Sequence, residues 1–130
     1  MTDMQNAMIR LAQQLKLPLP DPYSQDWANE VADSSRVAEW LSAYESGHFD
    51  SLEMSLLMTI ILESFNDLLG DGAADFQMWK RIEQLLVIHR AIHADSITHG
   101  SLNDEANPDN WFPLTHWMRL VRDQLPTTSG

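Results

Sequence analysis

Residues 50–70 read DSLEMSLLMTIILESFNDLLG, and this stretch decides the fold. Wound as a helix, its apolar residues cover an arc of roughly 200°. They are Met54, Leu57, Met58, Ile60, Ile61, Leu62, Phe65, Leu68 and Leu69. Since so wide an apolar arc must contact several neighbours, we expect a central hydrophobic helix over about 50–69. Asp50 and Glu53 resemble a capping box at its start, and Gly70 is expected to end it.

Helical periodicity recurs on both sides of this segment, and no convincing strand period is found. Before it, residues 3–17 and 24–46 are expected to be helical, with a break at residues 33–35 in the second region. After it, helices are expected over about 73–99 and from near Pro113, with Ile88 and Leu120 on their buried faces. The sequence therefore predicts an all-α fold, an irregular antiparallel bundle of five to six helices.

The size and composition of the chain fit a single domain. With 130 residues, 44% of them hydrophobic, a core can form without a disulfide or a metal, and there are no cysteines. We expect one helical domain over residues 1–125 and a disordered tail over 126–130. No long apolar run is found, and Asp3 argues against a signal peptide, so the protein is expected to be soluble and cytoplasmic.

Negative charge is concentrated in one part of the sequence. The net charge is −11, and residues 21–75 contain twelve acidic residues and one base, Arg36. Such a protein would be repelled by a nucleic-acid backbone, and it has no membrane span. Because the acids are segregated, we expect them to form a negative outer surface that attracts a basic protein.

His89 and His93 are four residues apart, a spacing that places both rings on one face of a continuous helix. Because that face is apolar, we interpret the pair as buried histidines that are hydrogen-bonded for structural reasons. The alternative is a small metal- or ligand-binding bundle, or an enzyme, that uses this pair. No catalytic motif, phosphate loop or dinucleotide fingerprint is present, so neither an enzyme nor a cofactor is predicted.

Five tryptophans are a high load for this length, and tryptophan is enriched at interface hot spots. Trp40, Trp79 and Trp117 lie on apolar stripes and are expected in the core. The leading functional hypothesis is a module that docks a basic protein, with an immunity or antitoxin-type inhibitor as one version and a structural homodimer as an alternative. The predicted partner-binding residues are Tyr23, Asp26, Trp27, Glu30, Asp33, Glu63, Asp67, Asp71 and Trp111.

Overall fold

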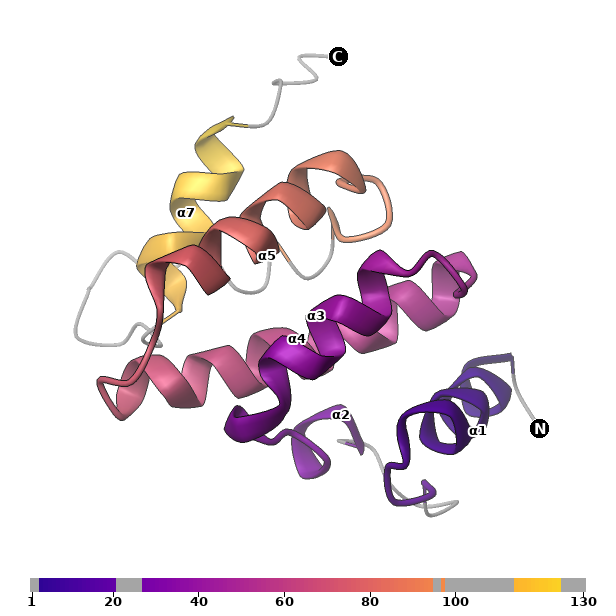
Figure 1. The fold of residues 1–130 in the computed structure, drawn as a ribbon. Helices are drawn as coiled ribbons and strands as arrows, with labels where there is room; N and C mark the ends of the chain where they lie inside the picture. Colours follow the sequence, from indigo (N-terminus) through magenta and orange to yellow (C-terminus); the bar gives the residue numbers. More distant parts are fainter. Residues whose placement is uncertain (1–2, 21–26, 95–96, 98–113, 125–130) are drawn as a thin grey trace. The chain divides into compact units, whose positions relative to one another are not determined.

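The computed structural model describes residues 3–20, 27–94, 97 and 114–124. These residues form helices and turns, and no strand is found among them, which confirms the predicted all-α bundle. Figure 1 shows α1 (Asp3–Leu15), α2 (Trp27–Glu30), α3 (Val37–Glu45), α4 (Ser51–Gly70), α5 (Phe76–Ile88) and α7 (Thr115–Gln124), with a short 3-10 helix, η1 (Ser34–Arg36), before α3. The expected tail over 126–130 lies outside the described residues.

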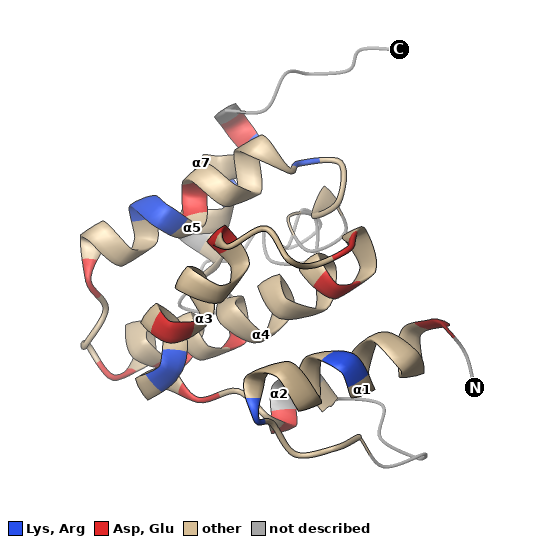
Figure 2. Cartoon of the chain, turned by 45° about the vertical axis from the view of Figure 1, so that its right-hand side comes forward, with Lys and Arg blue, Asp and Glu red and all other residues tan. Residues whose placement is uncertain are grey.

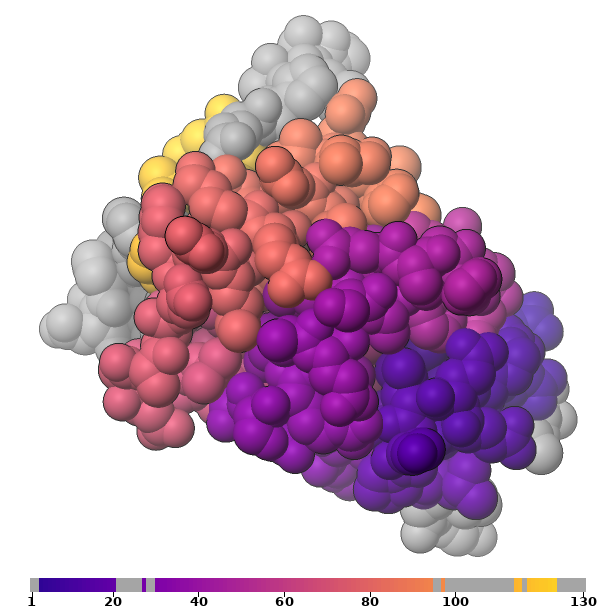
Figure 3. Space-filling model, in the orientation of Figure 1, coloured from indigo at the N-terminus to yellow at the C-terminus, as the bar shows by residue number. Residues whose placement is uncertain are grey.

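The chain divides into two compact units, an N-terminal unit of residues 1–65 and a C-terminal unit of residues 66–130. The prediction of a single domain over 1–125 stays a prediction. In the N-terminal unit the start of η1 is tied to α4, because the Asp33 N–H donates to the buried Ser64 hydroxyl at 2.9 Å. The same hydroxyl donates to the Ile60 carbonyl at 2.8 Å, so both of its hydrogen-bonding roles are used. In the space-filling view, α1 and the η1–α3 segment adjoin on one face of this unit (Figure 3).

The central helix α4 begins with the predicted capping box. The Glu53 N–H donates to Asp50 Oδ1 at 2.8 Å, and the Asp50 N–H donates to Glu53 Oε1 at 3.2 Å. The helix ends at Gly70, as predicted, and the residue with a positive φ that follows this end is Gly72, at +70°. The Ala73 N–H reaches the Leu68 carbonyl and the Gly72 N–H reaches the Leu69 carbonyl, which is the Schellman pattern of helix ends.

The capping box predicts a graded response to substitution. Glu53→Ala removes the acceptor of the Asp50 N–H, and we expect it to lower the free energy of unfolding by about 1–2 kcal/mol. Glu53→Gln keeps an acceptor oxygen and should cost clearly less. Urea denaturation of the two variants checks this. Equal losses would show that charge, rather than the cap, is what Glu53 contributes.

The predicted break at residues 33–35 is confirmed. Asp33 is the N-cap of η1, and its carboxylate accepts the Ser35 N–H at 2.9 Å. The Ser35 hydroxyl also donates to this carboxylate at 2.6 Å, and the two hydrogen bonds, the hydroxyl one first, hold the pKa of Asp33 below its ordinary value. Gly47, with φ +77°, follows the end of α3 as expected. Trp40 is fully buried, as predicted, and so are Leu41 and Val37 of the same helix.

In the C-terminal unit the helix predicted over 73–99 is shorter. It begins at Phe76 after the N-cap Asp75, whose carboxylate accepts the Gln77 N–H, and it ends at Ile88. Because the helix stops there, Ile88 is 68% exposed and not buried as expected. Leu120 of α7 is also exposed and not buried as expected, whereas Thr115, Met118 and Val121 of this helix are buried. Among the described helices none is long and apolar enough to cross a bilayer.

Candidate functional site

The exposed acidic residues of the N-terminal unit belong to several elements. Exposed carboxylates occur around η1 (Glu30, Asp33 and Glu39), near the end of α3 (Glu45) and just before α4 (Asp50). Figure 2 shows acidic residues in red on several elements of the unit. That the acids form one shared negative outer surface stays a prediction.

Two arginines of this unit are already engaged with its own acids. Arg10 of α1 lies 3.3 Å from Asp50 Oδ2 and 3.7 Å from Oε2 of the buried Glu53. Arg36 forms an ion pair with Glu39 one helical turn further on. The side-chain hydrogen bond from Arg36 lowers the pKa of Glu39 below its ordinary value.

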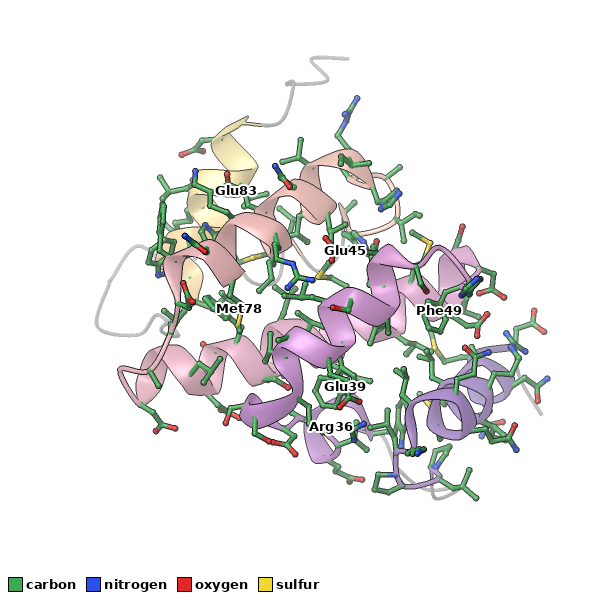
Figure 4. The ribbon with its side chains drawn as sticks, in the orientation of Figure 1. Arg36, Glu39, Glu45, Phe49, Met78 and Glu83 are labelled. Atoms are coloured by element: carbon green, nitrogen blue, oxygen red, sulfur yellow. The ribbon has the colours of Figure 1, made fainter. Side chains whose placement is uncertain are left out.

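Arg36 lies beside Glu39 at the start of α3 (Figure 4), and it makes three contacts. Besides the ion pair, its guanidinium donates to the Leu15 carbonyl at 2.7 Å, which is an otherwise open acceptor at the end of α1. It also lies 5.0 Å from the ring centroid of Trp40. Arg36 is therefore a structural tie between α1 and α3, and it is already occupied as a charge.

The acids around the α4–α5 turn differ from those of the N-terminal unit in that no arginine or lysine precedes them closely in the sequence. Asp67, Asp71 and Asp75 are all exposed, whereas Glu63 is half-buried. No lysine or arginine occurs in the sequence between Arg36 and Lys80. In the C-terminal unit this turn is compact, because the Asp71 N–H donates to the Asp67 carbonyl at 3.0 Å and the Schellman bonds close the helix end.

The predicted aromatic anchor Trp27 serves the core instead. It is 2% exposed, and its indole N–H donates to the Pro18 carbonyl at 2.9 Å. A partner cannot contact a side chain that this unit already covers, so Trp27 is not available as an anchor. Tyr23, Asp26 and Trp111 lie outside the described residues. Glu30 and Asp33 are exposed, as a docking surface requires.

His89 and His93 do not lie on one continuous helix. His89 is the C-cap of α5, with φ −108° and ψ 35°, and turns follow it. Helix-type bonding resumes at once, since the His93 N–H donates to the His89 carbonyl and the Ile97 N–H to the His93 carbonyl. The two rings lie edge to face with centroids 6.3 Å apart. The prediction that His93 is buried is confirmed, and His89 is half-buried.

Burial controls the protonation of His93. Removal of its ring from water lowers the pKa to about 4, and the neighbouring His89 adds to this shift. The imidazole is therefore neutral at neutral pH. Among the described residues no three histidine, aspartate or glutamate side chains are grouped closely enough to hold one metal ion. The metal-binding alternative consequently gains no support from this part of the chain.

An aromatic pair with one exposed ring, Phe76, was not predicted from the sequence, and its other member, Trp117, was expected in the core. Phe76, the first residue of α5, is 59% exposed, and its ring centroid lies 6.2 Å from that of Trp117 on α7. Trp117 is half-buried and packs edge-on against Trp79, with ring centroids 5.4 Å apart. Trp79 is in the core, as expected. The helical phase of Phe76 could have indicated this exposure, because at about 100° per residue Phe76 lies outside the arc of Trp79, Ile82, Leu85 and Leu86, wherever the helix begins.

A short chain of charges lies beside this pair. Lys80 Nζ is 5.2 Å from the Phe76 ring centroid and 3.7 Å from Glu83 Oε1, while Glu83 Oε2 accepts the Trp79 indole N–H at 3.2 Å. Figure 4 marks Glu83 on α5. Lys80 and Glu83 thus neutralise each other.

Comparison of the chain with family models, with curated proteins and with solved structures finds no match.

Proposed function

We propose that this protein is an acidic module that binds a basic protein. The supporting observation is that the excess negative charge is in contact with solvent. Residues 1–65 contain ten acidic residues and three basic ones, and two of those bases, Arg10 and Arg36, are engaged with acids of the same unit. Most carboxylates of the described residues are exposed, and Glu53 is the buried exception.

Exposed charge of one sign favours association with a partner of the opposite sign. It raises the rate of encounter and adds specificity, while the affinity itself depends on a few buried contacts. A partner that uses a basic surface for its own activity would be inhibited when that surface is covered. An immunity or antitoxin-type inhibitor is the specific version of this role that we propose.

The salt dependence of complex formation tests the proposal. The full chain, immobilised at low and at high salt, is exposed to extract of its source cells, and retained proteins are identified and purified. We expect a basic protein that is retained at low salt and that rebinds as a purified component, with affinity falling at least tenfold at high salt, where surface charges are screened.

The control for the charge dependence is a variant that is expected to keep the fold. Glu30→Gln, Asp33→Asn and Glu45→Gln together remove three charges, and Asn can still cap η1 at position 33. The proposal fails if no basic protein rebinds at low salt. It also fails if binding is indifferent to salt.

A further inference from the structure

Helix α1 lies at the edge of the N-terminal unit (Figure 1), and the residue that follows its last turn is strained. Lys16 has a φ of +57°, and within the described part of the chain it is the one residue other than glycine with a positive φ. A Cβ is crowded in this left-handed conformation, which favours glycine. The Leu17 N–H donates to the Ala12 carbonyl at 2.9 Å and so closes the end of α1 around Lys16. Strain is therefore stored where the chain leaves α1.

The strained residue lies between two hydrogen bonds that hold the chain on either side of it. Before it, the Leu15 carbonyl accepts from the Arg36 guanidinium at 2.7 Å. After it, the Pro18 carbonyl accepts the Trp27 indole N–H at 2.9 Å. A change of backbone angles at Lys16 would thus redirect α1 while Pro18 stays attached to its own unit.

Helix α1 docks on the N-terminal unit through an apolar face and an ionic contact. The buried residues of α1 are Ala7, Leu11, Ala12 and Leu15. Beside them, Arg10 lies 3.3 Å from Asp50 Oδ2 and 3.7 Å from Oε2 of the buried Glu53, both at the start of α4. If α1 swung away, the apolar surface beneath it would need a new cover. The α1 helix of a second copy carries the same residues at the same spacing and fits that surface without any new complementarity.

We propose that two copies of the chain exchange α1, so that α1 of each copy docks on the N-terminal unit of the other. Every contact of α1 is kept, and Lys16 leaves its left-handed conformation in both copies. Exchange of an identical element is a low-cost route to a dimer, since no new interface has to be built. This inference does not depend on the acidic binding role proposed above.

The strength of the dimer is set by the residue at the hinge. Each α1 also competes for its own unit at an effective concentration of about 1 mM, which is typical of a short linker, so equal contacts alone would give dimers only near that concentration. Relief of two left-handed residues favours the dimer by a further factor of about 10–100. We therefore expect a dissociation constant of about 10–100 µM, measured by sedimentation equilibrium of the full chain.

A crosslink between copies tests where α1 docks. The chain has no cysteine, so Arg10→Cys in one copy and Asp50→Cys in another provide the reactive thiols at two exposed positions that are in contact. The two variants are mixed at high concentration and treated with a short bismaleimide reagent. We expect a crosslinked dimer that contains one copy of each variant. A dimer without this crosslink would overturn the proposal, because another surface would then hold the copies together, and so would a chain that stays monomeric at about 1 mM.

Substitutions at position 16 test whether strain favours the exchange. Lys16→Gly removes the Cβ and relieves the closed monomer, so the dissociation constant of the dimer should rise about tenfold or more. Lys16→Gln is the matched control, because it removes the same charge but keeps the crowded Cβ. We expect it to change the constant by less than about twofold. Equal constants for the two variants would contradict the role given to Lys16.

Discussion

Lowering the pH from about 7 to about 4.5 is expected to remove roughly 2.5 kcal/mol of stability through His93 alone. The pKa of His93 is about 4 in the folded protein, against an ordinary value of 6.5. Between these values the unfolded chain binds a proton that the folded chain excludes. The stabilisation is therefore complete above the unfolded pKa and is lost as the pH falls towards the folded one.

The three carboxylates whose pKa values are lowered contribute little within this window. Hydrogen bonds lower the pKa of Asp33, of Glu39 and of Asp50, so the stability they add is present above their ordinary values and is lost at lower pH. The ordinary values are 3.8 for aspartate and 4.5 for glutamate. A loss of stability that begins near pH 6 consequently points to a histidine.

Urea denaturation across this pH range measures the effect, with His93→Gln as the variant. In His93→Gln the unfolding free energy should depend much less on pH. In His89→Gln it should depend on pH as steeply as in the unaltered protein. Because His93→Gln can itself destabilise the fold, NMR titration of the histidine ring protons in the unaltered protein is the independent measurement. A His93 resonance that titrates near pH 6.5 would contradict the prediction.

Replacing Arg36 is expected to cause the second large loss of stability. Arg36→Ala removes the donor to the Leu15 carbonyl, the ion pair with Glu39 and the contact with the Trp40 ring. We expect a loss of about 2 kcal/mol, since a charged hydrogen bond contributes about 1.5–3 kcal/mol and an exposed cation–π contact less. Thermal and urea denaturation both report it.

The matched variant is Glu39→Gln, which removes only the exposed ion pair. Exposed pairs of this kind contribute little, so the effect should be much smaller than that of Arg36→Ala. A double-mutant cycle between positions 36 and 39 then separates the ion pair from the other contacts. If the two single variants lose equal stability, the bond to the end of α1 contributes nothing.

Local signals in the sequence predicted most of the fold. The capping box of Asp50 and Glu53 and the break at Asp33 depend on residues a few positions apart, and both are confirmed. The end of α4 at Gly70 was predicted, whereas the end of α5 at Ile88 was not. The positive φ that follows α4 falls at Gly72, where the N–H groups of Gly72 and Ala73 bond to carbonyls of the last helical turn.

The site was predicted less completely than the fold. Phe76 was missed and Trp27 was assigned to a surface, because exposure depends on which neighbours cover a side chain. The indole of Trp27 is covered near Pro18, nine residues earlier across a proline-containing connector. The pairing of Arg10 with Asp50 links residues forty positions apart, and no local pattern indicates it.

The sequence by itself determined the helical class, the central helix and the excess of negative charge, since each follows from periodicity or composition. Only the tertiary structure decided which acids are exposed, which arginines are engaged, that His89 ends a helix, and that Phe76 is open to solvent. The physical reason is that burial and ion pairing are properties of packed surfaces, which bring together residues distant in the chain.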